Sequence, residues 1–298
     1  MIRFLAAALL SLSMTAARAE VPKVMTDIAP IQSLVDRVMA GLGSADVLLP
    51  PGASPHDYAL RPSDAGRLAD AGLVIWMGPG LEPWLADPLA TLAPNATRMA
   101  LLDSSGWDKL VLRGDAALFD GDPEDHPGET DPHAWLDPVV AAEWMQTIAA
   151  ALSAADPANA ATYAANAKAG AAEMQALVQE VSAQLAGVPD KPYLVPHDGY
   201  HYFEQRFARP AAGAVTLSDA VAPGPSRIAE LQARVAAGGI ACVLTDPETS
   251  TGWADVLRQG TTAKTASVDP MGASIPRGAG FYPALIRSIA DALAQCLS

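Results

Sequence analysis

Short apolar runs alternate with longer segments of helical periodicity along most of the chain. The runs are rich in valine, isoleucine and leucine, which is typical of strands buried in a parallel sheet. Such an alternation indicates βα units, in which helices cover the faces of parallel sheets. The expected strands are residues 23–28, 45–50, 73–78, 97–103, 192–196, 213–217, 240–246 and 264–268.

The strands fall into two groups of four, separated by a long Ala-rich segment with a helical pattern. That segment opens with Asp156 and Pro157, which suit a helix cap and a first helical position, and it stops at Gly187. We therefore predict an α/β fold of two similar lobes, each a mainly parallel four-stranded sheet flanked by helices, joined by one long rigid helix. The expected divisions are residues 20–155 for the N-terminal lobe, 156–187 for the linker helix and 188–298 for the C-terminal lobe.

The first 19 residues have the layout of a cleavable secretory signal. Arg3 precedes a short apolar run, and the segment ends in Ala-Arg-Ala, so we expect cleavage after Ala19. The run is too short to span a membrane, and no cysteine follows it on which a lipid anchor would be built. The sequence thus predicts a periplasmic protein without a lipid anchor.

The chain is acidic, with a formal charge of −14. Removing the signal takes away two arginines and no acid, so the charge becomes −16. This balance disfavours nucleic acid and anionic membranes as partners and suits a protein that gathers cations, although it is also typical of solubility alone. Residues 115–131 are the most acidic stretch, and we expect a mobile surface loop there. Within it, Glu124, Asp125 and His126 are candidates for a secondary metal site.

The chain has two cysteines, Cys242 and Cys296. In an exported protein a disulfide between them is the expected state, and two buried free thiols are the alternative. The chain-entropy model gives such a bridge on the order of 4 kcal/mol of stabilisation.

Three of the five histidines, His56, His133 and His197, occur in loops after strands. Asp269 has the same setting. In open parallel sheets, the loops at the carboxyl ends of the strands form the ligand crevice. A proline accompanies each of these four residues and restricts its loop before any ligand binds. These prolines are Pro55, Pro132, Pro196 and Pro270.

Three imidazoles and one carboxylate suit Zn²⁺ in a four-coordinate site, whereas Mn²⁺ would draw a second carboxylate. The same ligands also describe a catalytic zinc, so a zinc hydrolase is the alternative from another class. The sequence has no HExxH helix, no closely spaced pair of acids and no phosphate-binding GxxxxGK motif. We therefore expect a binding protein and no enzyme. His201 and Glu204 are candidates for residues that support the ligands.

Other residues have structural interpretations. Asp137 with Pro138, and Pro62 with Asp64, are predicted to begin helices. Several aromatic residues would either wall the metal cleft or pack in the core. They are Trp76, Trp84, Trp135, Tyr200 and Phe203.

Several motifs, in order, make the chain resemble the metal-binding components of bacterial ABC importers, specifically the zinc-specific ZnuA-type family. The motifs are SPHDYALRPSD, VIWMGPGLEPWL, DPHAWLDP, the long helix after DPANAATYAAN, PHDGYHYFE and DPMG. The resemblance implies two lobes joined by a long helix, with the metal in the cleft between them. The family's three histidine positions fall on His56, His133 and His197, and its late carboxylate falls on Asp269. A disulfide like Cys242–Cys296 also occurs in zinc members.

The resemblance implies a monomer that captures Zn²⁺ and delivers it to a membrane permease served by a separate ATPase subunit. Manganese or another divalent metal is the alternative cargo. Two departures from the family pattern stand out. The acidic loop replaces a longer histidine-rich loop, which implies weaker collection of zinc. Pro55 occupies the place of a glutamate discussed as a ligand in some members, so the fourth ligand is expected to be Asp269 or water.

Overall fold

The computed structural model describes residues 21–113, 129–216, 222–247 and 252–298. Two four-stranded sheets, parallel throughout, form the centres of two lobes, and their strand orders are β2-β1-β3-β4 and β6-β5-β7-β8. The predicted fold class is confirmed. The strands are β1 (Val24–Thr26), β2 (Asp46–Val47), β3 (Leu73–Trp76), β4 (Thr97–Ala100), β5 (Tyr193–His197), β6 (Gly213–Thr216), β7 (Cys242–Thr245) and β8 (Lys264–Ser267).

Each predicted strand is present, but most are shorter than their apolar runs. The run at residues 97–103 divides into β4 and the 3-10 helix η1 (Leu101–Asp103). Leu101 and Leu102 are both buried, so this tight turn places two consecutive apolar side chains in the core.

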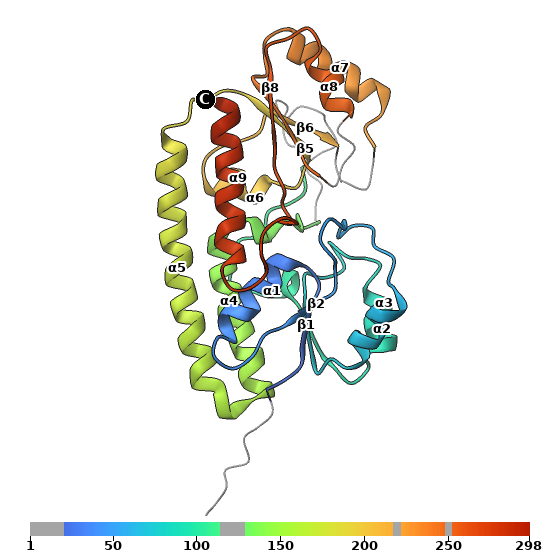
Figure 1. Cartoon of the computed structure of the whole chain (residues 1–298), viewed down its shortest axis with the longest axis vertical. Helices are drawn as coiled ribbons and strands as arrows, with labels where there is room; N and C mark the ends of the chain where they lie inside the picture. The colour runs from blue at the N-terminus through green and yellow to red at the C-terminus, as the bar shows by residue number, and fades with distance from the viewer. Residues whose placement is uncertain (1–20, 114–128, 217–221, 248–251) are drawn as a thin grey trace, which may run out of the picture.

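Helices cover both sheets and join the two lobes (Figure 1). The first sheet carries α1 (Ala29–Val38), α2 (Pro62–Ala69) and α3 (Ala86–Leu92). Between the sheets come η2 (Ala134–Leu136), α4 (Pro138–Ala155), η3 (Pro157–Asn159) and α5 (Ala160–Ala186). The second sheet carries α6 (His201–Arg206), α7 (Pro225–Ala236), α8 (Gly252–Arg258) and α9 (Phe281–Leu297).

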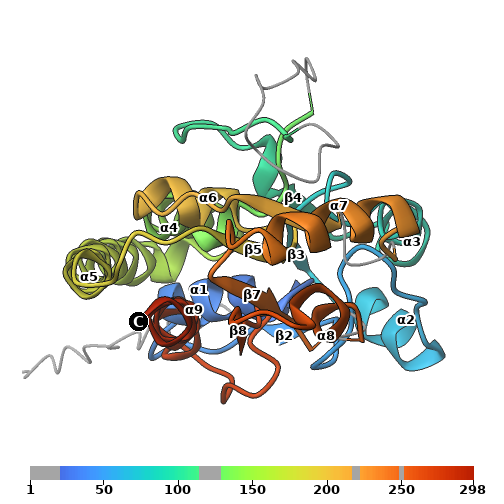
Figure 2. The ribbon, with the colours of Figure 1, turned by 90° about the horizontal axis from the view of Figure 1, so that it is seen from above.

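The linker helix runs along one side of the molecule and packs against other helices (Figures 1 and 2). The expected helix over 156–187 begins as η3 and continues as the 27 residues of α5. The side chain of Asp156 does not cap η3, because it accepts hydrogen bonds from Asn159 at 2.6 Å and from the Tyr163 hydroxyl at 2.9 Å. Contacts of α5 with α1, α4 and α9 make the connection between the lobes stiff.

Buried apolar residues of both lobes belong to one continuous core. Val24 and Leu73 of the first sheet and Tyr193 of the second are members, as is Tyr282 of α9. A smaller cluster, which includes Leu194 and Val243, lies under α7 and α8. Because one core spans both sheets, the lobes are not independent bodies on a flexible tether.

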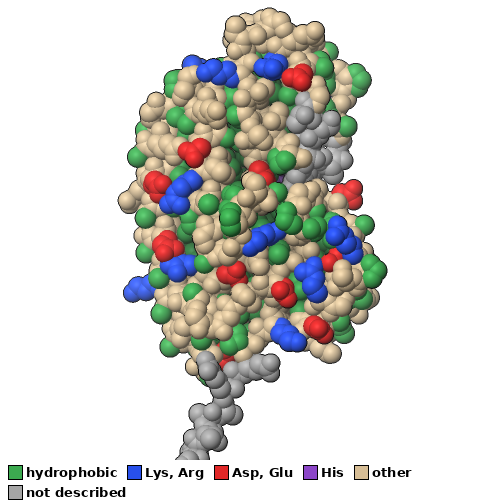
Figure 3. Space-filling model, in the orientation of Figure 1, with side chains coloured by type: hydrophobic (Ala, Val, Ile, Leu, Met, Phe, Trp, Pro, Cys, Tyr) green, Lys and Arg blue, Asp and Glu red, His purple; other side chains and the backbone are tan. Residues whose placement is uncertain are grey.

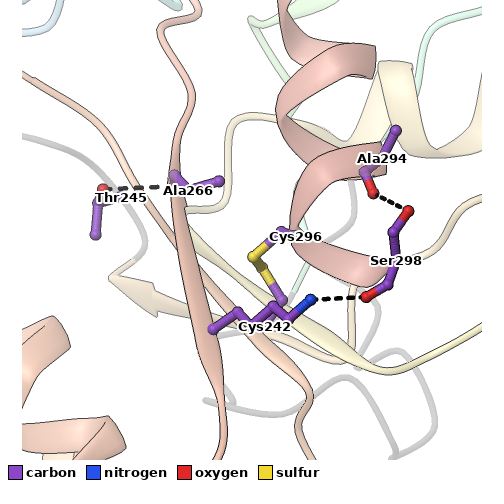
Figure 4. Close-up of a disulfide and its surroundings, with 7 residues drawn as sticks. Cys242, Thr245, Ala266, Ala294, Cys296 and Ser298 are labelled. Atoms are coloured by element: carbon purple, nitrogen blue, oxygen red, sulfur yellow. Dashed lines mark hydrogen bonds between the residues drawn. A yellow bond between two sulfur atoms is a disulfide. The ribbon is translucent and has the colours of Figure 1, made fainter.

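The Cys242–Cys296 disulfide is present, as predicted, and joins β7 to α9 (Figure 4). The two Cα atoms are 5.8 Å apart, and the residues are 54 positions apart in sequence. The bridge therefore fastens the second sheet to the helix that packs along α5.

Three of the sequence predictions fall outside the described residues, and one of them is the predicted mobile acidic loop at residues 115–131, of which only the last three residues are described. The other two are the secretory signal at residues 1–19 and the candidate secondary metal site at Glu124, Asp125 and His126. The lobe boundaries at residues 155 and 188 stay a prediction. Within the described ranges, no helix is both long and apolar enough to cross a membrane.

Candidate metal centre

Three histidines converge where the two lobes meet. His56 lies in the loop after β2, His133 directly precedes η2, and His197 is the last residue of β5. One ring nitrogen from each lies within 4.8 Å of those of the other two. The structure thus brings together the three histidines that the sequence singled out, and their use as metal ligands stays a prediction.

The rings are close enough to share one ion. The Nε2 atoms of His56 and His133 are 3.1 Å apart, and the ring centroids of His133 and His197 are 5.4 Å apart. Nitrogens bound to one tetrahedral zinc ion at about 2.0 Å lie a little over 3 Å from each other. The spacing fits such an ion, and the burial of His133 and His197 keeps water away from two of the three rings.

Two buried carboxylates orient two of the rings. Asp131 Oδ1 lies 2.8 Å from Nδ1 of His133, and Asp246 Oδ2 lies 3.3 Å from Nδ1 of His197. A carboxylate beside Nδ1 keeps the ring proton on that atom, so the lone pair of Nε2 is available to a metal. The carboxylate also makes Nε2 more basic. Burial raises the pKa of Asp131 to about 6, although the backbone N–H of His133 acts against that shift.

Two tryptophans donate hydrogen bonds to the prolines that accompany His56 and Asp269. Trp84 Nε1 donates to the carbonyl of Pro55 at 2.7 Å, and Trp135 Nε1 donates to the carbonyl of Pro270 at 3.0 Å. Each loop is therefore restrained twice, by the rigid proline ring and by the hydrogen bond to the proline carbonyl. For two of the four candidate residues, His56 and Asp269, the accompanying proline is thus held by a contact that limits how far its loop moves.

Of the candidate aromatic walls, two lie against the ligand rings. The Trp135 ring is 5.3 Å from that of His133, and the Tyr200 ring is 5.7 Å from that of His197. Trp76 and Phe203 are core residues. The walls of the site are thus mostly apolar, which strengthens the interaction of the imidazoles with a charged ion.

The hollow between the histidines is small. Pro55, Trp135, Pro270 and Met271 line it together with the three rings, and the space between them is too narrow for an organic molecule. The site therefore has the size of a bare ion rather than of an organic molecule.

Asp269 does not join the three histidines in the structure. Its Oδ1 accepts the backbone N–H groups of Met271 at 2.9 Å and Gly272 at 2.7 Å, and its Oδ2 accepts that of Ala273 at 2.7 Å. These donors hold the carboxylate in a turn directly before Pro270, whose carbonyl Trp135 binds. Its predicted role as a ligand stays a prediction.

The two predicted supporting residues contact acids and bases near the site. Nδ1 of His201 is 3.7 Å from Asp131 Oδ2, and burial lowers the pKa of His201. Glu204 pairs with Arg113 at 2.8 Å. Asp137 has the predicted structural role, because it caps α4 through the backbone N–H of Val139 at 2.7 Å.

Sequence reasoning missed the roles of Asp131, Asp246 and Arg113. One signal was available for Asp246, because it precedes Pro247 at the end of a strand, in the same pattern as Asp269 before Pro270. Asp131 stands two residues before a singled-out histidine and was interpreted only as the end of the acidic loop. Arg113 had no local signal, since its partners lie about 90 residues later.

A family model described as the periplasmic component A of a zinc-uptake complex matches residues 24–296. The high-affinity zinc uptake system protein ZnuA of Brucella suis is 36% identical over 92% of this chain and 91% of its own length. That of Paracoccus denitrificans is also 36% identical, over 98% of this chain and 96% of its own.

Solved structures share the fold at lower identity. The crystal structure of ZnuA superposes with a TM-score of 0.78 at 22% identity, covering 93% of this chain and 99% of that one. The laminin-binding protein of Streptococcus agalactiae, described as an adhesin with metal-transporting activity, gives 0.77 at 23%, covering 93% and 100%. A solute-binding protein of Pseudomonas aeruginosa in complex with Mn²⁺ gives 0.77 at 20%, covering 93% and 98%.

Proposed function

Because the chain belongs to the ZnuA family of periplasmic zinc-uptake components, we propose that it captures Zn²⁺ between its lobes and delivers the ion to an ABC transporter. His56, His133 and His197 supply three ligands, and Asp269 or a water molecule supplies the fourth. The observation that carries this proposal is the convergence of three ring nitrogens within 4.8 Å at the junction of the lobes.

The choice of zinc follows from the chemistry of the ligands. Imidazole nitrogens suit Zn²⁺, whereas Mn²⁺ favours carboxylate and water oxygens. The nearest carboxylates, Asp131 and Asp246, approach the rings at Nδ1, on the side away from the shared ion. They offset the charge of a buried dication without contacting it.

The site supports binding rather than catalysis. A catalytic zinc needs an open coordination position and space for a substrate beside it. The hollow, closed by Trp135, Pro270 and Met271, has no such space. In this proposal the ion is cargo, and the protein performs no reaction on it.

Delivery requires a membrane permease with a separate ATPase subunit as the partner. We place the protein in the periplasm as a monomer, released from its signal after Ala19. The lobes span residues 20–155 and 188–298 in this proposal, with the linker helix between them. On the face in Figure 3, which α5 and α9 border, the acidic and basic side chains drawn are interspersed.

The decisive experiment is a titration of purified protein with zinc and with manganese under competition from a chelator. We expect one tightly bound zinc ion and much weaker manganese binding. A stoichiometry above one points to a second site, for which His126 and its neighbouring acids are the candidates.

His133→Ala should lower zinc affinity by more than a hundredfold. His201→Ala is the matched control, because it removes an imidazole that lies 3.7 Å from Asp131 but outside the three-histidine group. Its effect should stay below tenfold. If His133→Ala keeps the parent affinity, the assignment is wrong.

A further inference from the structure

The guanidinium of Arg113 bridges two buried carboxylates. Its Nε donates to Asp198 Oδ1 at 2.9 Å and Oδ2 at 3.2 Å, and its terminal nitrogens reach the two oxygens of Glu204 at 2.8 and 3.1 Å. The side chains of Asp198 and Glu204 are 4% and 2% exposed, and that of Arg113 is 16% exposed. Burial raises the pKa of Glu204, and the hydrogen bond from Arg113 opposes this shift. One cation thus pairs with two carboxylates that are buried away from water.

These partners come from different lobes. Arg113 lies in the segment between β4 and η2, whereas Asp198 follows the last residue of β5 and Glu204 lies on α6. Val111, two residues before Arg113, pairs with Thr130 in an antiparallel bridge. The segment that carries Arg113 is therefore fastened to the segment that leads into His133.

Three further contacts join α6 to the same part of the first lobe. The hydroxyl of Tyr202 accepts the backbone N–H of Leu110 at 2.9 Å. Arg206 binds both oxygens of Asp137, each at 2.7 Å. His201 faces Asp131. The helix that begins four residues after His197 is thus bound to the chain on both sides of His133.

The ion pairs of Arg113 stabilise the arrangement with the lobes together more than one with the lobes apart. When the lobes are together, removal of Arg113 would leave the buried carboxylates of Asp198 and Glu204 without a cationic partner, although Glu204 would keep the backbone N–H of Ala211. Burying two carboxylates without a cation costs more than the intact pairs contribute. When the lobes separate, water reaches both carboxylates and this cost disappears. The arginine consequently stabilises the closed arrangement specifically.

We propose that Arg113 is a positioning residue that holds the two lobes closed on the ion and thereby sets how slowly the ion leaves. The proposal rests on the function proposed above. Arg113 acts through Asp198, the sequence neighbour of His197, and through α6. It controls the release of zinc, while the histidines determine which ion is bound.

The test compares Arg113→Gln with Arg287→Gln in the full mature chain. Arg287 forms an equivalent two-pronged pair with Glu180, but between the exposed faces of α9 and α5. Zinc release into excess chelator is followed by stopped flow, and thermal unfolding of the zinc-free proteins is measured in parallel. We expect release from Arg113→Gln to be at least tenfold faster than from the parent, and release from Arg287→Gln to change less than threefold.

Arg113→Lys keeps the charge but loses the planar fork, so its release rate should lie between those of the parent and Arg113→Gln. A purely structural role would lower the unfolding temperature and leave release unchanged, and that result would overturn the proposal.

A triple variant covers the case in which Arg113→Gln does not fold. Arg113→Gln, Asp198→Asn and Glu204→Gln together leave no charge unpaired, so the fold should be retained while the ion pairs are lost. Fast release from this protein supports the proposal, and release at the parent rate overturns it.

The proposed function and this inference fail separately. If the parent protein binds no zinc, the proposed function is wrong. The role of Arg113 in holding the lobes together is then tested by small-angle scattering of the zinc-free proteins. A larger radius of gyration in Arg113→Gln than in Arg287→Gln supports it, and equal radii refute it.

Discussion

Asp131 holds His133 at two points, because the same carboxylate oxygen lies 2.8 Å from the ring Nδ1 and accepts the backbone N–H at 2.9 Å. The ring and the main chain of this residue are therefore fixed by one acid. His197 has a looser version of this arrangement, in which Asp246 lies 3.3 Å from Nδ1.

Asp131→Asn should lower zinc affinity by about 10- to 100-fold, the usual effect of removing a carboxylate that orients a metal-bound histidine. The longer Asp246–His197 contact predicts a smaller loss for Asp246→Asn. Chelator competition measures both, with Asp108→Asn, an exposed acid, as the control. Equal affinities in all three variants would contradict the assigned role.

Asp269→Asn tests the fourth ligand. We expect zinc affinity to fall tenfold or more, because the neutral amide is a poorer ligand than a carboxylate that three backbone N–H groups hold in place. Unfolding of the zinc-free variant reports separately on the turn, where loss of such a bond costs about 1 kcal/mol. Unchanged affinity would assign the fourth position to water.

Loss of the disulfide should destabilise the chain without abolishing zinc binding. The paired substitution Cys242→Ala and Cys296→Ala is expected to lower the free energy of unfolding by about 2–5 kcal/mol, because the bridge restricts the unfolded chain. Urea denaturation measures the loss. Zinc affinity should stay within threefold, since the bridge lies between β7 and α9 and away from the histidines. A large loss of affinity would mean that the bridge also shapes the site.

A buried carboxyl pair lies in the first lobe. Asp27 follows β1 and accepts the backbone N–H of Ile28 at 2.7 Å, and Glu82 is fully buried beside it. Burial, followed by the negative charge of Asp27, raises the pKa of Glu82 well above its usual value, and burial also raises the pKa of Asp27. One proton between the two acids is the state that the fold favours at moderate pH.

This pair predicts how stability depends on pH. Between the unfolded value near 4.5 and the higher folded pKa of Glu82, the folded chain keeps a proton that the unfolded chain has lost. The free energy of unfolding of the zinc-free protein should therefore decrease as pH rises above about 4.5, until the pH passes the folded pKa of Glu82.

Glu82→Gln should flatten this decrease, because the amide cannot ionise. Glu143→Gln, an exposed acid on α4, should leave the slope unchanged. Urea denaturation at several pH values gives the slopes. Equal slopes in the parent and in Glu82→Gln would show that Glu82 does not carry the effect.

The sequence predicted the framework well because buried parallel strands are continuous apolar runs, as in Leu73–Trp76. The ends of parallel strands also account for the positions of His56 and His197, whereas His133 directly precedes η2, far along the chain from the end of β4. The boundaries of elements were less predictable. The run at residues 97–103 ends as a 3-10 turn with both leucines buried, and whether such a run continues as a strand depends on neighbours that are distant in sequence.

The partners of the site residues were the least predictable part. The hydrogen bond of Asp246 to His197 joins residues 49 positions apart, and the ion pairs of Arg113 span 85 and 91 positions. No local pattern encodes such pairs, because they depend on how the lobes pack. The positions of the three histidines in the sequence therefore indicated that they gather at the cleft. They did not indicate which acids orient the rings.

The tight hollow between the histidines also determines what an ion must lose before it binds. Because the space between the rings is narrow, we expect a cation to shed most of its hydration shell as it binds. Mg²⁺ gives up its water reluctantly and gains little from imidazole nitrogens, so it is rejected at the step of dehydration. Zn²⁺ recovers the cost of dehydration from the nitrogens. The lining of Pro55, Trp135, Pro270 and Met271 thus filters ions by their hydration before the ligands select among them.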